Sequence, residues 1–150
     1  ENKINLPYFT LNPGQLVLLQ GNSGSGKSSL LETIIGYEGR LIDKSAKPYV
    51  VSVSILISQY LPNLSIKTSS IISKQDWELF QFLKDIKYLS ERRLFEYSGG
   101  QLQRILLAHA ILSEKKFIIL DEGLSGINVE LERLALKELK KYLKNYKAFG

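Results

Sequence analysis

The sequence contains neither cysteine nor methionine. Without cysteine, disulfide bonds and cysteine-ligated zinc sites are excluded. Without methionine, the chain does not begin at a natural start codon, and we expect it to be a segment of a longer protein. No apolar run is long enough to cross a bilayer, and no signal peptide is visible, so a cytosolic setting is the default expectation. Low-complexity tracts and internal repeats are also missing.

The composition fits one globular domain. The chain has 150 residues and is 44% hydrophobic, which is enough for a single domain with a core. Its net charge of +5 suits a nucleic acid, a membrane surface or a nucleotide. The basic residues are spread along the chain and are not interleaved with aromatic residues, as they are in a groove that binds single strands. A lysine-rich solvated surface is therefore favoured, and no direct nucleic-acid partner is expected.

Predicted strands and helices alternate along the chain. Buried strands are predicted over 15–20, 49–57 and 117–120, and helices over 27–35, 76–90, 98–112 and 129–146. Asp76 and Asn128 are predicted N-caps, and Ser98 with Gln101 has the spacing of a capping box. This order of elements implies a parallel sheet with helices on both faces.

The string GNSGSGKSS at 21–29 fits the phosphate-loop pattern G-x-x-x-x-G-K-[ST] between a predicted strand and a predicted helix. Its glycines let backbone N–H groups curl around a phosphate chain, and the positive end of the next helix points at the same phosphates. Lys27 would contact the β- and γ-phosphates, and Ser28 would ligate Mg²⁺. An incidental Gly/Ser loop is the alternative, and the flanking elements argue against it. The predicted nucleotide-binding residues are Gly21, Asn22, Ser23, Gly24, Ser25, Gly26, Lys27, Ser28 and Ser29.

Two adjacent acids follow the apolar run FIIL at 117–120. They stand at the carboxyl end of a predicted strand, where open α/β sheets bind ligands. Asp121 is expected to hold Mg²⁺ through water, and Glu122 to orient and deprotonate an attacking water as general base. A polar strand end at the surface is the alternative, and the apolar residues before the acids argue against it.

The string SGGQ at 98–101 lies between these two motifs. Two glycines at a helix start leave backbone N–H groups uncovered, and the Ser98 hydroxyl adds a further donor. This is an anion site without a lysine. Taken alone, the string is explained as well by a capped helix, so its position between the other motifs makes it informative.

In this order, the three strings resemble the nucleotide-binding domain of the ABC ATPases over nearly the whole chain. The resemblance implies an α/β P-loop NTPase with a mostly parallel central sheet flanked by helices, plus a small helical subdomain over about 60–97 that carries the signature motif. We expect a single partial domain over 1–150. Its catalytic α/β core would comprise 1–59 and 113–150, and its helical subdomain with the signature helix 60–112.

In that family two domains pack head to tail, and ATP on one phosphate loop (Walker A) is covered by the signature motif of the other domain. The resemblance implies Mg²⁺-dependent ATP hydrolysis that powers a transporter at the cytoplasmic face of the membrane. The implied partners are a second nucleotide-binding domain, identical or different, and transmembrane domains. Carried over by position, the residues that contact the partner's γ-phosphate would be Ser98, Gly99, Gly100 and Gln101.

The family's Q-loop glutamine corresponds to Gln59, which would touch Mg²⁺ and the attacking water. The implied catalytic residues are thus Lys27, Gln59 and Glu122, and the implied metal ligands are Ser28, Gln59 and Asp121. The sequence also departs from the family pattern: Tyr97 replaces the usual leucine of the signature, and Asn128 replaces the usual aspartate of the D-loop at 125–128. The family's switch histidine would follow residue 150, so His109 is interpreted as structural.

Two other functions remain open. A soluble ABC ATPase acting on DNA or ribosomes is disfavoured, because the DNA-repair and chromosome-maintenance members carry long insertions between the phosphate loop and the signature, and none is present here. A regulatory nucleotide-binding module with little hydrolysis is suggested by Asn128 and Gly123. A generic P-loop kinase gives no reason for SGGQ.

Overall fold

The computed structural model describes residues 22–35, 54–58, 65–113, 117–122 and 124–148. The helices and strands are α1 (Lys27–Ile35), β1 (Ser54–Ser58), α3 (Gly99–Leu112), β2 (Phe117–Asp121) and α4 (Val129–Ala148). Between β1 and α3 lie the short 3-10 helices η3 (Thr68–Ser70), η4 (Asp76–Glu78), η5 (Gln81–Leu89) and η6 (Leu94–Glu96). The strand predicted over 15–20 lies outside the described residues.

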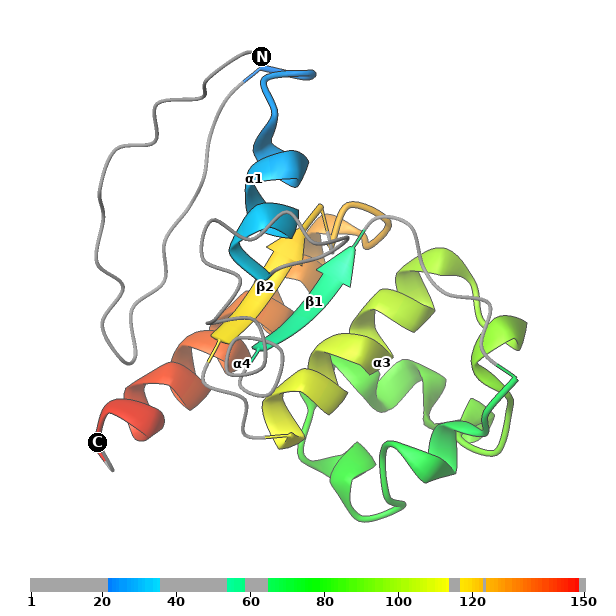
Figure 1. Ribbon diagram of the computed structural model, residues 1–150. Coiled ribbons are helices and arrows are strands. Elements are labelled where there is room, and N and C mark those ends of the chain that lie inside the picture. The colour runs from blue at the N-terminus through cyan, green and yellow to red at the C-terminus, as the bar shows by residue number, and fades with distance from the viewer. Residues whose placement is uncertain (1–21, 36–53, 59–64, 114–116, 123, 149–150) are drawn as a thin grey trace.

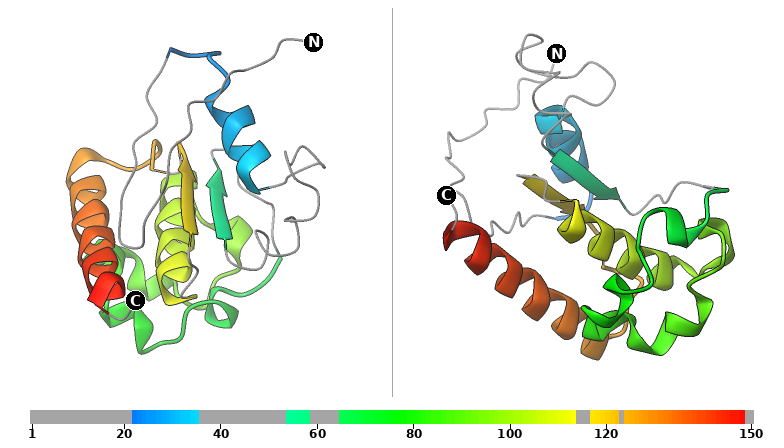
Figure 2. Two further views of the ribbon diagram at one scale, coloured as in Figure 1. Left: turned by 60° about the vertical axis from the view of Figure 1, so that its left-hand side comes forward. Right: turned by 90° about the horizontal axis from the view of Figure 1, so that it is seen from below.

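The two described strands pair in parallel. Their register runs from Ser54 opposite Phe117 to Ser58 opposite Asp121, so both carboxyl ends lie at the same edge (Figure 1). Helix α1 lies on one face of this pair, and α3 and α4 lie on the other (Figure 2). The described pair is thus parallel with helices on both faces, and a mostly parallel central sheet stays a prediction.

The helices predicted around the motifs form as expected. Helix α1 has the predicted bounds, and Ser98 caps α3 through a reciprocal capping box with Gln101. Asn128 caps α4, because its Oδ1 accepts the Leu131 N–H over 2.9 Å. Acidic residues in the first turn of α4 also suit the positive end of its helix dipole.

The prediction of one continuous helix over 76–90 is wrong. The segment forms two 3-10 helices, η4 and η5, separated by Phe80 in an extended conformation. Asp76 is not the N-cap either, because Gln75 precedes η4. The Asp76 carboxylate instead accepts hydrogen bonds from the Ser73 N–H (3.2 Å) and hydroxyl (2.6 Å). The Asp76 N–H donates in turn to Ser73 Oγ over 3.3 Å, so the two residues form a reciprocal pair at the start of η4.

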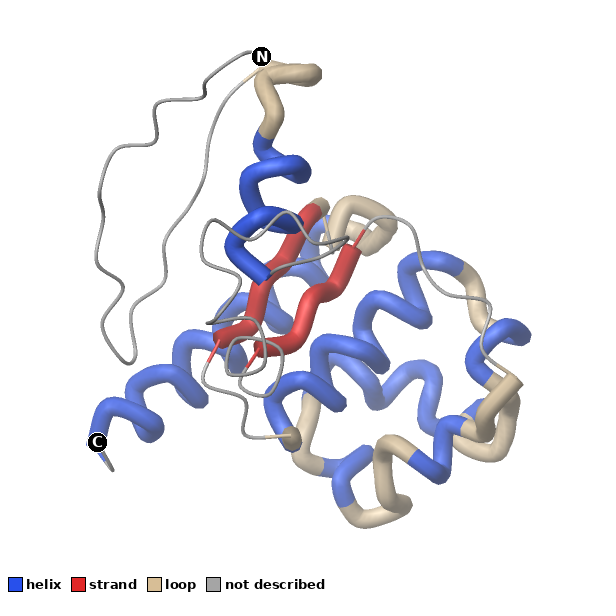
Figure 3. The backbone as a smooth tube through the Cα atoms, viewed as in Figure 1, coloured by secondary structure: helices blue, strands red, loops and turns tan. Residues whose placement is uncertain are grey.

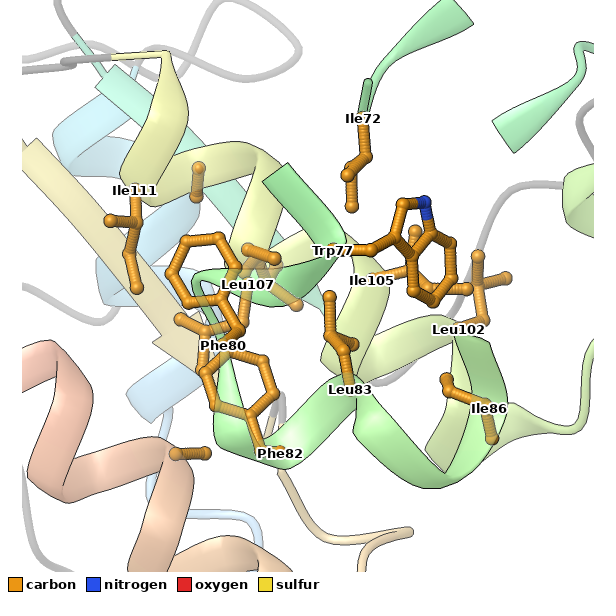
Figure 4. Close-up of a cluster of buried hydrophobic side chains, with 14 of the residues drawn as sticks. Ile72, Trp77, Phe80, Phe82, Leu83, Ile86, Leu102, Ile105, Leu107 and Ile111 are labelled. Carbon is orange, nitrogen blue, oxygen red and sulfur yellow. The ribbon is translucent and has the colours of Figure 1, made fainter. Parts of the chain in front are cut away.

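These 3-10 helices pack on α3 around a shared apolar core (Figure 4). Trp77 is 1% exposed and packs in the core. The core residues labelled in the figure come from both partners: Ile72, Trp77, Phe80, Phe82, Leu83 and Ile86 on one side, and Leu102, Ile105, Leu107 and Ile111 on α3. Burying such side chains contributes about 1.5 to 3 kcal/mol each, so α3 and the 3-10 helices stabilise one another.

A buried arginine strengthens this contact. Arg104 of α3 is 4% exposed. Its guanidinium donates to the Phe82 carbonyl (2.8 Å) and to the Asp85 carboxylate (2.6 Å). A buried cation needs such partners, because leaving it unpaired costs several kcal/mol. Helix α3 is therefore fixed to η5 by polar as well as apolar contacts.

The tube in Figure 3 shows that helix dominates the region formed by α3 and the 3-10 helices. Within the described residues, no helix is both long and apolar enough to span a membrane.

Candidate functional site

The phosphate-loop residues form an exposed turn before α1. Gly24 and Gly26 have φ values of 78° and 86°, which residues other than glycine rarely adopt. The Asn22 carbonyl sits inside the turn and accepts from the Ser25 N–H (3.1 Å) and from Lys27 Nζ (2.9 Å). The loop thus has the tight curvature that a phosphate chain requires, with the ammonium group folded over it. Gly21 lies outside the described residues.

The start of α1 suits a bound anion. The first turn of this helix contains no acidic residue that would compete with a phosphate, and its free N–H groups carry a partial positive charge. Ser28 and Ser29 are exposed there, as is Ser23 in the turn. The Ser29 carbonyl accepts the Thr33 hydroxyl over 2.6 Å. The described residues of the loop and helix therefore fit a phosphate group.

The two acids occupy different environments at the end of β2. Asp121 is partly buried and stands opposite Ser58 in the sheet. Glu122 is exposed and has φ 51°, making it the one residue other than glycine with positive φ in the described part of the chain. Strained backbone of this kind tends to cluster at functional sites. Gln59, which follows Ser58, lies outside the described residues.

The donor set at this edge is chemically suited to Mg²⁺. A carboxylate from Asp121 and a hydroxyl from Ser28 are hard oxygen ligands of the kind that Mg²⁺ uses. Helix α1 also contacts β2, so the two motifs are carried by neighbouring elements. Among the described residues, no group of three or more His, Cys, Asp or Glu side chains is arranged to hold a metal. A magnesium site here would need phosphate oxygens and water as further ligands.

The signature motif lies open at the start of α3. Ser98 and Gly99 are exposed. The Ser98 N–H donates to the Gln101 side-chain oxygen over 3.0 Å, and the Gln101 N–H approaches Ser98 Oγ at 3.4 Å. A Cβ built on Gly99 would have nothing within 4 Å. Another molecule can therefore reach this helix start.

The second signature glycine has a different environment. A Cβ built on Gly100 would lie 2.1 Å from the carbonyl oxygen of Gly126 in the same chain. The prediction that both glycines donate to an anion leaves out this packing role. No sequence motif points to Gln103 either, which is 3% exposed and bonds to Glu122 and Gly126.

Tyr97, the departure at the start of the signature, is 8% exposed. Its hydroxyl donates to the Leu89 carbonyl and accepts from the Thr68 hydroxyl over 3.0 Å. Burial raises the pKa of Tyr97 above its ordinary value, while the Thr68 hydrogen bond lowers it by less. The tyrosine therefore adds a polar anchor that leucine cannot provide.

His109 lies on the side of α3 that faces the η3 region. Its Nδ1 is 3.1 Å from the Ile71 carbonyl oxygen, which accounts for the ring by a packing contact. This contact supports the structural interpretation of the histidine.

Comparisons with known proteins agree with these motifs. The family model described as "ABC transporter" matches residues 4–125. The chain is 30% identical to the spermidine/putrescine import ATP-binding protein PotA of Legionella pneumophila (strain Paris), over 94% of the chain and 45% of that protein. It is 33% identical to the zinc import ATP-binding protein ZnuC of Ruegeria sp. (strain TM1040), over 80% of the chain and 51% of that protein. No solved structure gives a significant match.

A second ZnuC, from Vibrio cholerae serotype O1, is 30% identical over 81% of the chain and 50% of that protein. The chain spans about half the length of the curated relatives it matches. The match to the family model covers most of the sequence and includes all three motifs. The chain therefore belongs to the ABC transporter family of ATP-binding proteins.

Proposed function

We propose that this chain binds ATP and, with Mg²⁺, hydrolyses it to drive a membrane transporter. The observation that carries the proposal is the contact between the two elements that carry the motifs. A glycine turn with positive φ at Gly24 and Gly26 opens α1, and α1 contacts β2, the strand that ends in Asp121. Phosphate-binding groups and carboxylates are therefore present on neighbouring elements.

Each part of the loop has a role in this proposal. The backbone of the loop, from Gly21 through Asn22, Ser23, Gly24, Ser25 and Gly26 to Ser29, cradles the phosphates together with the helix start. Lys27 releases the Asn22 carbonyl, to which it now donates over 2.9 Å, and turns to the β- and γ-phosphates. Exchanging a carbonyl for a phosphate gives the ammonium a stronger, charge-assisted partner.

Ser28, Gln59 and Asp121 would hold Mg²⁺, which neutralises charge on the transferred phosphoryl group. Glu122 would accept the proton of the attacking water. Its exposure and left-handed backbone support this role. The exposed carboxylate is open to water, and the left-handed backbone turns the chain away from the regular strand at this residue. Gln59 would help orient the same water.

A second nucleotide-binding domain would complete the site. We propose that Ser98, Gly99, Gly100 and Gln101 bind the γ-phosphate held by that partner, in a head-to-tail pair. The exposed helix start at Ser98 and the open space above Gly99 support this arrangement. ATP binding would then bring two domains together, and hydrolysis would release them.

The finer architecture also belongs to the proposal. Residues 1–59 and 113–150 would form the α/β core with a mostly parallel central sheet, and residues 60–112 would form the helical subdomain. Transmembrane domains would be the further partners, which places the chain at the cytoplasmic face of a membrane. The relatives are named for the import of spermidine/putrescine and of zinc. These substrates differ, so the similarity supports the shared ATP-driven step rather than one substrate.

The test uses the full-length protein and measures steady-state ATPase activity. Lys27→Ala and Glu122→Gln should each lower turnover by at least about 100-fold, since each removes a charged group from the phosphoryl-transfer step. Lys140→Ala and Glu91→Gln are the matched controls, because both residues are exposed and outside the motifs. Both controls should keep normal turnover.

Glu122→Gln should also trap a dimer that requires ATP, visible by size-exclusion chromatography. Undiminished turnover in both site variants would contradict the mechanism. Tight ATP binding with no measurable turnover in the unaltered protein would favour the regulatory module instead. Salt-dependent binding to duplex DNA would favour a non-transport ABC ATPase.

A further inference from the structure

A buried glutamine on the signature helix reaches the segment that follows the catalytic strand. Gln103 is 3% exposed. Its side-chain oxygen accepts the Gly126 N–H over 3.0 Å, and its side-chain nitrogen lies 3.4 Å from the Glu122 carbonyl oxygen, to which it donates. One amide group thus contacts both ends of the segment 122–126.

Gly126 is pressed against the helix backbone. A Cβ on Gly100 would meet the Gly126 carbonyl oxygen at 2.1 Å, and a Cβ on Gly126 would lie 3.3 Å from the Gly100 nitrogen. Gly100 and Gln103 lie on one face of α3 because they are three residues apart. The helix face that contacts Gly126 therefore begins within the first turn of α3, next to its N-cap Ser98.

The segment contains the residue with the left-handed backbone. Glu122 has φ 51°, and its carbonyl also accepts the Ser125 N–H over 3.0 Å. A backbone held in this region costs about 1 to 3 kcal/mol and persists only when its surroundings fix it. The described contacts that fix this carbonyl are the turn itself and the Gln103 amide.

We infer that Gln103 is a positioning residue for ATP hydrolysis: it holds the Glu122 peptide in place from α3, the helix that presents Ser98 to the partner domain. This inference rests on the proposed function. Gln103 touches neither the nucleotide nor the attacking water in this assignment. It acts through the Glu122 backbone. Helix α3 therefore links Glu122, the proposed general base for the nucleotide of the same chain, to the residues at 98–101 that are proposed to contact the partner's nucleotide.

The variants are Gln103→Met and Gln103→Glu in the full-length protein. Methionine has a similar volume and removes both hydrogen bonds. An ionised glutamate keeps an acceptor for the Gly126 N–H but places a second oxygen against the Glu122 carbonyl. Gln75→Met is the matched control, because Gln75 is exposed and its side chain makes no capping bond.

Both Gln103 variants should lower kcat about tenfold, the kinetic effect of losing one well-placed hydrogen bond, while KM for ATP stays within about twofold. The control should change neither. In a Glu122→Gln background, Gln103→Met should have no further effect on residual turnover, because the group that it positions has already been disabled. A purely structural role would instead lower turnover in both backgrounds in proportion to the folded fraction.

The inference is overturned if kcat of Gln103→Met stays within about twofold of the control, or if its effect multiplies fully with that of Glu122→Gln. If Gln103→Met does not fold, Gln103→Glu in the same two backgrounds decides the matter. The proposed function is judged separately by Lys27→Ala. Loss of activity in that variant with a normal Gln103→Met enzyme would keep the function and refute the positioning role.

Discussion

The adjacent signature glycines should respond in opposite ways to the same substitution. In Gly100→Ala the new Cβ would lie 2.1 Å from the Gly126 carbonyl oxygen and 2.9 Å from its carbon. Both contacts are with backbone, which cannot rotate away as a side chain can. In Gly99→Ala the new Cβ would have nothing within 4 Å, and Gly99 does not have positive φ.

The magnitude follows from these distances. Real Cβ contacts essentially never fall below 3.0 Å, so the helix and the 122–126 segment must separate by about 0.9 Å. Overpacking of this kind costs about 1 to 3 kcal/mol, and the loosened Gln103 hydrogen bonds add about 1 kcal/mol. We therefore expect Gly100→Ala to lower the free energy of unfolding by about 2 to 4 kcal/mol. Gly99→Ala should raise it by about 0.5 kcal/mol, because alanine restricts the unfolded chain.

Urea denaturation without nucleotide measures both effects. Trp77, the one tryptophan of this sequence and 1% exposed in the core beside α3, provides a fluorescence signal for unfolding. Equal m-values would show that the change in midpoint reports stability. Equal stability of the two alanine variants would refute the close approach of Gly100 to Gly126.

Two further predictions concern groups outside the reaction centre. Tyr97→Phe should lower the free energy of unfolding by about 0.5 to 1.5 kcal/mol, because the Leu89 carbonyl loses the tyrosine donor but keeps the Arg92 N–H; urea denaturation checks this, and an unchanged midpoint would contradict the anchoring role. Burial raises the pKa of Glu138, against the smaller opposing effect of the Gln81 N–H that donates to it over 2.8 Å. A raised pKa means that the folded state holds the proton more tightly, so this stabilisation is present below the ordinary value of 4.5 and is lost as pH rises through the raised value. The melting temperature of the unaltered protein should therefore fall relative to that of Glu138→Gln as pH rises over that window. If the melting temperature of the unaltered protein minus that of Glu138→Gln stays constant or rises, that would be evidence against this prediction.

Much of the site could be read from residue order, because its motifs depend on local backbone chemistry. A glycine turn before an apolar helix, acids after an apolar strand and a Ser-x-x-Gln cap each act within a few residues of one another. The structure accordingly has α1, α3 and β2 at the predicted places. The capping roles of Ser98 and Asn128 are local in the same sense.

Contacts between distant segments could not be read in this way. Nothing near Gly100 in the sequence indicates that it meets Gly126, and nothing near Gln103 indicates that it bonds to Glu122. These pairs form only when α3 and the end of β2 pack together. The error over 76–90 has the same origin. The apolar spacing predicts a continuous helix, whereas in the folded chain Trp77 and Phe82 are buried from two separate 3-10 helices.

Neighbouring residues of α3 hold different partners: Gln103 reaches the Glu122–Gly126 segment, and Arg104 reaches η5. Each residue of an α-helix turns by about 100°, so inserting one amino acid between Gln103 and Arg104 would rotate one of these side chains away from its partners while the other stayed in place. The spacing across this stretch should therefore be intolerant of length changes, even where individual side chains on its exposed side can be exchanged. An engineered version of the protein must keep this phase.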